Sequence, residues 1–404
     1  MALSFEVTVQ GNTRTLTKVI ITEIKDLTDQ KLTKDTVSEI KRRIWNLRLF
    51  SSVRIDQPDN TKILIQVKER WTTIPIMKFS SGGGSSYFAL GVYDINTAGL
   101  NTELGIQYEE LNKRAAGVLW LRKPQFLYNR NFLVGIDLWN INRIRFMFDQ
   151  DGNESGAYTL QRKKSNLFFE YKFHSDLYKL GLNLEYNDDQ ISDFGLDQEQ
   201  IELNTKNGFR PEYKSITRWY TFYFEVGRLN YKNYLVDGKK LILTSSLAAT
   251  SSFEDKILSK HELKFNYYKL IKNTQNLAWQ FKFSANNLNQ LQFQNYIGGF
   301  SEVRGYQDGQ FSTPAFWQNN LEYRTNLYEN KFGIVQGAVF SDQANETTLL
   351  NNTTDKNMPM MLSTGFGIRL ISPKIYRFVG RIDYAQTHTR VLEKGISIGI
   401  QQFF

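Results

Sequence analysis

The chain contains 404 residues, carries a formal net charge of +9 and has no cysteine. Without thiols there can be no disulfide framework, no thiolate zinc site and no cysteine nucleophile. The histidines at 174, 261 and 388 are isolated from one another, so we expect neither a metal site nor a cofactor. No run approaches the roughly 18 consecutive apolar residues of a membrane helix. This excludes helical membrane proteins but not β-barrels, whose strands carry a weaker signal.

The first seventy residues predict a small α/β domain. Residues 5–10 alternate between apolar and polar side chains, which predicts a strand. A short helix is expected next, and Thr33 is a suitable N-cap for a second helix. Residues 53–56 and 63–67 predict two further strands. The order predicts one domain, residues 1–70, in which two helices pack on a three-stranded sheet.

Residues 71–404 differ in character and predict β-structure throughout. Segments of about ten residues place aliphatic or aromatic side chains at one parity and polar or small ones at the other. The alternation is clearest at 103–109, 180–186, 277–286 and 395–400. A soluble β-sandwich also alternates. However, a second face made of polar, charged and glycine residues favours the water-filled lumen of a membrane barrel.

The number of segments and the lengths of their connections favour a closed barrel. We count about sixteen segments, an even number as in bacterial single-chain outer-membrane barrels. Tight connections at 175–176 and 273–274 contrast with long polar ones at 188–215, 288–314 and 343–359. Short turns on one rim and long loops on the other are typical of such barrels. The predicted fold is an N-terminal α+β domain followed by a C-terminal transmembrane β-barrel of about sixteen antiparallel strands.

Short motifs connect both parts of the chain to a known family. The N-terminal part contains V-x-G-N at 9–12, L-F-S-S-V at 49–53 and I-x-V-x-E at 65–69. A long connection of the barrel carries V-R-G-Y at Val303, Arg304, Gly305 and Tyr306. With these motifs the chain resembles the outer-membrane assembly and translocation superfamily that joins POTRA domains to a sixteen-stranded barrel. This is the BamA-like, bacterial surface antigen family, here with a single POTRA domain at 1–70.

The resemblance implies a role for the arginine of the V-R-G-Y motif. In the family the sixth loop, here about 288–314, folds back into the lumen of the barrel, here 71–404. Its arginine pairs with acidic residues on the next two strands, and the matching positions are Glu322 and Asp342. The sequence departs from the family at Ala344, because a glycine commonly follows the aspartate.

The first and last strands would meet at a seam that could open as a lateral gate. We expect this seam between 71–79 and 395–404, and its candidate residues are Trp71, Pro75, Gly395, Gly399 and Phe404. Glycine weakens pairing and packing in a strand, and proline removes a donor. Two other interpretations stay open, namely that Gly399 gives room to the loop and that Pro75 marks a bulge. The terminal aromatic Phe404 resembles the family's signal for insertion.

The resemblance implies a non-enzymatic pore in the bacterial outer membrane, with the POTRA domain in the periplasm. The first residues lack the basic and apolar segments of a secretory leader, so we expect a cytosolic protein or one whose leader has been removed. Expected partners are outer-membrane lipid, an unfolded β-barrel or secreted client polypeptide, and periplasmic accessory proteins. Nucleic acid is not expected, because Lys and Arg are spread along the chain. The charge of +9 is a hint of contact with anionic lipid.

Two other functions stay open. A two-partner-type secretion transporter usually carries two POTRA domains and a plug helix, and neither is evident here. A patatin-type lipolytic protein also joins a POTRA domain to a barrel, but its catalytic G-x-S-x-G motif is missing. The nearest match, at 299–303, lacks the last glycine. We therefore expect this chain not to be an enzyme.

Overall fold

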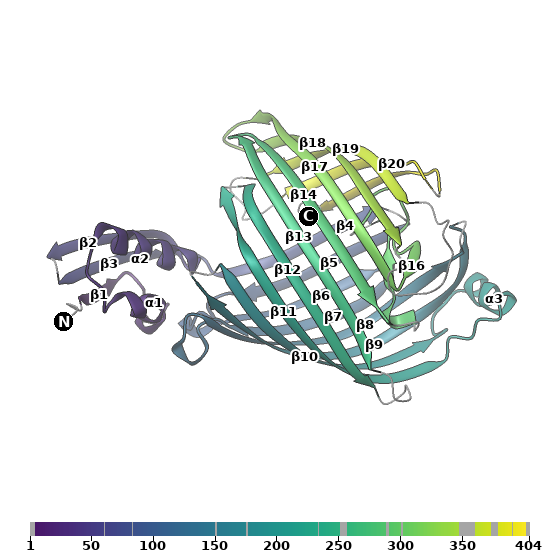
Figure 1. Cartoon of the computed structure of the whole chain (residues 1–404), viewed down its shortest axis with the longest axis horizontal. Helices are drawn as coiled ribbons and strands as arrows, with labels where there is room; N and C mark the ends of the chain where they lie inside the picture. The colour runs from purple at the N-terminus through teal and green to yellow at the C-terminus, as the bar shows by residue number, and fades with distance from the viewer. Residues whose placement is uncertain are drawn as a thin grey trace.

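The computed structural model describes residues 5–59, 61–82, 84–149, 152–174, 177–232, 234–250, 257–287, 291–299, 302–346, 360–372, 379–389 and 391–400. A small α/β domain at the N-terminus is followed by one large closed barrel, as Figure 1 shows. None of the helices in these described ranges is long and apolar enough to cross a membrane.

The N-terminal domain has the predicted order of strands and helices. Its elements are β1 (Glu6–Gln10), α1 (Thr17–Ile24), η1 (Lys25–Leu27), α2 (Lys34–Asn46), β2 (Phe50–Asp59) and β3 (Lys62–Glu69). The sheet order is β1-β3-β2, with β1 parallel and β2 antiparallel to β3. Ile20, Ile40 and Ile65 are fully buried between the helices and the sheet. Thr33 caps α2, because its hydroxyl accepts a hydrogen bond from the Thr36 amide at 3.2 Å.

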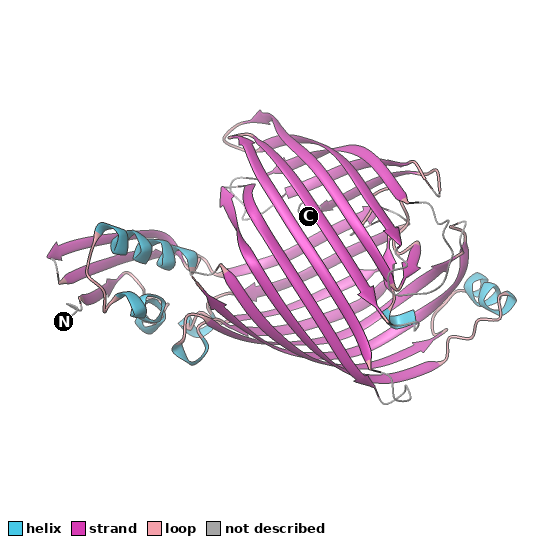
Figure 2. Ribbon diagram, viewed as in Figure 1, coloured by secondary structure: helices cyan, strands magenta, loops and turns pink. Residues whose placement is uncertain are grey.

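The predicted barrel is confirmed, with sixteen antiparallel strands in one closed sheet (Figure 2). The strands are β4 (Thr73–Gly82), β5 (Ser85–Asp94), β6 (Glu103–Leu111), β7 (Arg114–Lys123), β8 (Phe132–Phe148), β9 (Glu154–Phe173), β10 (Tyr178–Ser192), β11 (Tyr213–Lys232), β12 (Leu235–Thr250), β13 (Leu258–Lys272), β14 (Gln275–Asn286), β17 (Ala315–Glu329), β18 (Ile334–Glu346), β19 (Met361–Ile371), β20 (Val379–Thr387) and β21 (Lys394–Ile400). Between them lie η2 (Thr97–Gly99), η3 (Phe126–Tyr128), α3 (Gln198–Lys206), η4 (Leu291–Phe293) and the short strands β15 (Asn295–Ile297) and β16 (Phe311–Thr313).

The two faces of the barrel wall differ as the alternation predicts. Outward side chains are large, apolar and exposed, for example Phe222 at 56% and Phe366 at 60%. Inward side chains are polar and buried, for example Asn320 and Glu322. An exposed apolar surface of this extent marks contact with lipid or with another protein. The alternation also explains why aromatic residues are frequent although the chain has a negative mean hydropathy.

The connection between β13 and β14 lies on the opposite rim from the long connections between β10 and β11 and between β14 and β17, as predicted, and a further tight turn also lies on the rim of the long connections. The connection between β13 and β14 is tight and lies on the rim that faces the N-terminal domain. The connection between β6 and β7 is equally tight but lies on the opposite rim, where Asn112 and Lys113 both have positive φ. α3 also lies on that far rim (Figure 1). The predicted turn at 175–176 falls outside the described residues.

Candidate functional site

The sixth loop connects β14 to β17 and enters the lumen of the barrel. β15 and β16 pair within it as a short hairpin, with Tyr296 opposite Ser312. Beyond the hairpin, Val303 and Tyr306 are fully buried and Arg304 is 1% exposed. A long loop loses much conformational entropy when it is ordered. Specific contacts with the wall must therefore hold it in place.

Arg304 is paired with carboxylates from three strands, the most distant being Asp383 of β20 at 3.5 Å from its Nη1. Its Nε and Nη2 donate to the two oxygens of Asp342 on β18 at 2.7 and 3.0 Å, and its backbone amide donates to the same carboxylate at 3.2 Å. Its Nη1 donates to Glu322 on β17 at 2.7 Å. The guanidinium lies over the ring of Phe340, 3.4 Å from its centroid. The two-pronged contact uses the planar fork of arginine, which a lysine could not reproduce.

Glu322 and Asp342 are the two partners that the resemblance to the family implies for Arg304. Both carboxylates are fully buried. A buried charge is tolerated only when it is paired and hydrogen-bonded. Each of these carboxylates has such partners, so the positive charge of Arg304 in the loop is neutralised by negative charges of the wall.

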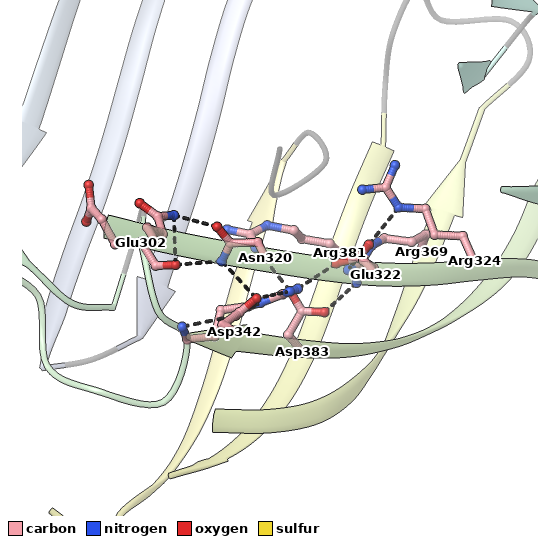
Figure 3. Close-up of polar contacts among 10 residues, drawn as sticks. Glu302, Asn320, Glu322, Arg324, Asp342, Arg369, Arg381 and Asp383 are labelled. Atoms are coloured by element: carbon pink, nitrogen blue, oxygen red, sulfur yellow. Dashed lines mark hydrogen bonds and ion pairs between the residues drawn. The ribbon is translucent and has the colours of Figure 1, made fainter. Parts of the chain in front are cut away.

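Three further arginines and one aspartate extend this arrangement along the wall. Arg324 donates to Glu322 at 2.6 Å, and Arg369 of β19 contacts Glu322 at 3.1 Å and Asp383 of β20 at 2.5 Å. Arg381 of β20 donates to Asp383 at 3.0 Å. Figure 3 shows these side chains as a continuous row. We call Arg304, Glu322, Arg324, Asp342, Arg369, Arg381 and Asp383 the lumen network.

Sequence reasoning missed four members of the lumen network, namely Arg324, Arg369, Arg381 and Asp383. Their signal was parity, since Leu321, Ile368 and Ile382 on the same strands are exposed on the outer face. Parity assigns a residue to the lumen, but it does not say which charges meet. The register decides this, because it sets Arg369 opposite Arg381.

Polar side chains also hold the backbone of the loop just before Arg304. The carbonyl of Glu302 accepts hydrogen bonds from Asn320 at 2.7 Å and from Gln318 at 3.1 Å. Asn320 also donates to Asp342 at 2.9 Å. The carboxylate of Glu302 itself points away from the arginines (Figure 3). Charge pairing and backbone contacts therefore fix the same short segment.

Gly305 and Tyr306 bring the loop against β19 and β20. Gly305 has φ +97°, a left-handed conformation that favours glycine. A Cβ on Gly305 would lie 3.2 Å from the Cβ of Ala385. The hydroxyl of Tyr306 donates to the carbonyl of Thr389 at 2.7 Å and accepts from the amide of Leu362 at 3.1 Å.

The opposite side of the loop is attached to another part of the wall, which the sequence did not indicate. The hydroxyls of Tyr296 in β15 and Tyr158 in β9 lie 2.6 Å apart, and Tyr158 is fully buried. Tyr296 also donates to the carbonyl of Leu291 at 2.9 Å. Arg145 of β8 lies over the ring of Tyr296, 5.0 Å from its centroid. The loop therefore bridges the lumen from β9 to β20.

The residues that the sequence predicts at the seam do not all lie in the paired strands. Trp71 precedes β4 and is 80% exposed, so the prediction began this strand two residues too early. Pro75 lies within β4, opposite Val92 of β5. Phe404 falls outside the described residues. In the described part of the chain, β4 and β21 meet at two residue pairs, Ser81 with Ile398 and Ser80 with Gly399.

Both seam glycines give room to neighbouring groups. A Cβ on Gly395 would lie 3.2 Å from the Cα of Gly305 in the sixth loop. A Cβ on Gly399 would lie 3.0 Å from Nε of Arg381, a member of the lumen network. The last strand therefore contacts both the loop and the charges that bind it.

The N-terminal domain contacts the near rim of the barrel through the start of α1. Arg14 forms an ion pair with Asp94 at the end of β5, at 2.5 Å. Asn96 donates to the hydroxyl of Thr15 at 2.9 Å. Gly99 approaches so closely that a Cβ there would lie 2.1 Å from the carbonyl oxygen of Arg14. Glycine is therefore needed in this turn.

A second contact joins α1 to the turn between β7 and β8. Gln125 donates to the carboxylate of Glu23 at 2.9 Å and to the carbonyl of Val19 at 3.2 Å. Arg130 pairs with the same Glu23 at 3.4 Å, and both side chains are largely buried. Two contacts at separate turns restrict the rotation of the domain relative to the barrel.

The described residues contain no cluster of His, Cys, Asp and Glu that could hold a metal ion. The lumen network pairs its carboxylates with arginines, which compete with a cation for the same oxygens. The arrangement is suited to holding a loop.

Comparisons with known proteins agree with this architecture. Residues 6–70 match the POTRA family model described as a surface antigen variable number repeat, and residues 93–404 match the Omp85 superfamily domain. A search of the curated proteins returned no match. The chain is similar in structure to BamA from Haemophilus ducreyi lacking POTRA domains 1–3, with a TM-score of 0.67 and 15% identity over 98% of this chain and 84% of that one.

Two further structures are similar to the chain. CdiB from Acinetobacter baumannii gives a TM-score of 0.71 and 12% identity over 99% of this chain and 74% of that one. CdiB from Escherichia coli gives 0.61 and 10% over 98% and 90%. At these identities the likeness shows the fold, whereas the superfamily model covers most of the sequence directly. The predicted resemblance is thereby confirmed, and the chain belongs to the Omp85 superfamily, with a POTRA domain ahead of its barrel.

Proposed function

We propose that this protein lies in the bacterial outer membrane and inserts client polypeptides into it through the seam between β4 and β21, without catalysing a chemical reaction. The observation that carries this proposal is the contrast between neighbouring strand pairs. Ten residue pairs join β4 to β5, whereas two described pairs join β4 to β21. Opposite residues of antiparallel strands alternate between pairs that exchange backbone hydrogen bonds and pairs that do not, and both kinds bring side chains into contact. Within the described residues, the seam is therefore held by fewer residue pairs than the neighbouring contact between β4 and β5.

The lumen network lies next to this seam. Gly399 gives room to Arg381, and Gly395 gives room to Gly305 of the sixth loop. Because Gly395 and Gly399 both lie in β21, separating β21 from β4 affects the contact of Gly399 with Arg381 and that of Gly395 with Gly305. The loop and the seam are therefore mechanically connected, while the other anchors keep the loop across the lumen.

The POTRA sheet supplies a place for the client to bind. In the described residues β2 pairs with β3 alone, so its other edge carries unpaired backbone groups. An exposed sheet edge can accept an incoming strand through main-chain hydrogen bonds. The contacts of α1 and the residues before it hold the domain against the near rim of the barrel. With the POTRA domain in the periplasm, an unfolded barrel client would meet β2 first.

The seam can be tested by locking it. The chain has no natural cysteine, so Ser81→Cys with Ile398→Cys forms one defined disulfide across the seam. Directly opposite residues have Cβ atoms close enough for such a bridge after a small adjustment. The matched control is Ser81→Cys with Ser86→Cys, which joins β4 to β5 at an equivalent position. Both variants are reconstituted in liposomes with an unfolded barrel client, and its folding rate is measured.

We expect the oxidised seam variant to lose its acceleration of client folding and to regain it on reduction. The control variant should accelerate folding in both states. A secretion transporter that passes its client through the lumen would work with a locked seam, so retained activity of the oxidised variant would contradict the gate. No acceleration by the unmodified protein over empty liposomes would contradict insertion altogether.

A further inference from the structure

Part of the positive charge of this protein is concentrated on the lumen face of β13 and β14. Lys264 lies directly opposite Lys282 in the register, and Lys260 extends from the same face of β13. All three side chains are half-buried. Like charges directly opposite each other on neighbouring strands destabilise a sheet. We call these three residues the lysine patch.

The carboxylates of the wall do not balance the lysine patch. Glu262, between the two lysines of β13, lies 3.5 Å from Nζ of Lys282. Among the residues that the structure describes, no carboxylate lies within ion-pair distance of Lys260 or Lys264. Lysines on other strands do have such partners, for example Lys164, which is 2.6 Å from Glu185. The patch therefore carries surplus positive charge.

The lysine patch also differs from the lumen network in the chemistry of its cations. Arginine offers a rigid fork for a fixed partner, whereas lysine is a point charge on a flexible stem. The arginines are held by hydrogen bonds to buried carboxylates. Lys282 has one long ion pair and lies 5.4 Å from the centroid of the Phe316 ring. It is also opposite Gln318, which binds the sixth loop. The patch is thus an adaptable cationic surface beside the loop.

We propose that the lysine patch binds carboxylate groups of an acidic polypeptide segment that enters the barrel. This inference rests on the proposed function, because that function makes the client a polypeptide, whose anionic side chains are aspartate and glutamate. Half-exposed lysines form weak ion pairs, each contributing up to about fivefold in affinity. Weak contacts of this kind attract a segment and release it again, as transient passage requires.

The test uses the full chain in phosphatidylcholine vesicles and two labelled peptides of one sequence. One peptide contains Asp and Glu, and the other has Asn and Gln in their place. Affinity is measured by fluorescence anisotropy. A carbodiimide then joins carboxylates to lysine amines without a spacer, and mass spectrometry identifies the lysine. We expect Lys264 and Lys282 to be joined to the acidic peptide, with an affinity that falls as salt rises.

Variants make the test specific. Lys264→Gln with Lys282→Gln should weaken binding of the acidic peptide by up to about fivefold for each lysine removed. Lys264→Arg with Lys282→Arg should retain the affinity, because it keeps both charges. Lys163→Gln should also retain it, because Lys163 is exposed on β9, where its neighbours of the same parity, such as Tyr171, face outward. The gel mobility of unheated samples verifies that every variant forms a barrel.

Three outcomes would overturn the proposal. The first is equal affinity for both peptides, and the second is unchanged affinity in the double glutamine variant. The third is that inorganic phosphate binds at the lysine patch while neither peptide binds to the protein. Binding at the patch by a protein that does not accelerate client folding would support the lysine patch and contradict insertion. The two proposals can therefore fail separately.

Discussion

Gly395 of the last strand lies against Gly305 of the sixth loop, so closely that a Cβ on Gly395 would be 3.2 Å from the Cα of Gly305. These residues are 90 positions apart in the chain, Gly305 in the V-R-G-Y motif and Gly395 at the predicted seam. Their contact links the V-R-G-Y motif to the seam. A glycine weakens the strand that contains it. At Gly395 the missing side chain also lets the backbone of the last strand approach the backbone of the loop.

Gly395→Leu should therefore displace the loop. The added Cβ already presses on the backbone of Gly305, and overpacking of this kind costs about 1–3 kcal/mol. Unfolding in urea, monitored by gel mobility in detergent, should show a lower midpoint than that of the unmodified protein. Gly380→Ala is the control, because a Cβ there meets its nearest neighbour at 3.8 Å. Equal midpoints for the two variants would show that the loop does not need this space.

Arg304→Ala should lower both the stability of the barrel and its activity. Removing the guanidinium leaves the buried carboxylate of Asp342 without its two-pronged partner. Breaking a buried pair typically costs about 3–5 kcal/mol. The urea midpoint and the client-folding rate would both report the change. Lys163→Ala should alter neither, because this exposed lysine lies on the outer face; equal behaviour of the two variants would contradict the anchor.

Tyr296→Phe should release the other side of the loop. Loss of its hydroxyl leaves the buried hydroxyl of Tyr158 without this partner, at a cost of about 1–3 kcal/mol. Cleavage of the sixth loop by an added protease measures its release. A double-mutant cycle with Arg304→Ala tests whether the anchors act together. We expect faster cleavage in the double variant than in either single one, and a rate equal to that of Arg304→Ala would mean that Tyr296 contributes nothing.

The POTRA domain should become less stable in acid through Glu39 of α2. Hydrogen bonds from Arg42, and then from Arg43, lower the pKa of Glu39 to about 2 although burial opposes this. An unfolded chain binds this proton near pH 4.3. The stabilisation is therefore fully present above about pH 4.3 and is lost as the pH falls toward 2. At pH 6 the α2 amides should exchange hydrogen more slowly in the unmodified protein than in Glu39→Gln. Near pH 2 the two exchange rates should be equal.

Much of the fold could be predicted because alternation is a local property. The β segments predicted from parity lie within a few residues of the observed strands, and Thr33 was identified as the cap of α2 from its type and place. The predicted first strand included Trp71, which lies before β4. An aromatic residue can stand inside a strand or just beside it, so its type alone does not show where the strand begins. The contrast between tight and long connections did not indicate the additional tight turn on the far rim, which Asn112 and Lys113 form through positive φ.

The sequence by itself determined that this chain forms a POTRA domain and a barrel, and that the V-R-G-Y motif lies in its sixth loop. It could do so because side-chain period and short motifs are read within a few neighbouring residues. Only the tertiary structure decided which charges meet, since Arg369, Arg381 and Asp383 come together through strand register. It also decided that Tyr296 reaches Tyr158, 138 positions away, across the lumen. Closure of the barrel sets these distances, because each strand's position depends on all the others.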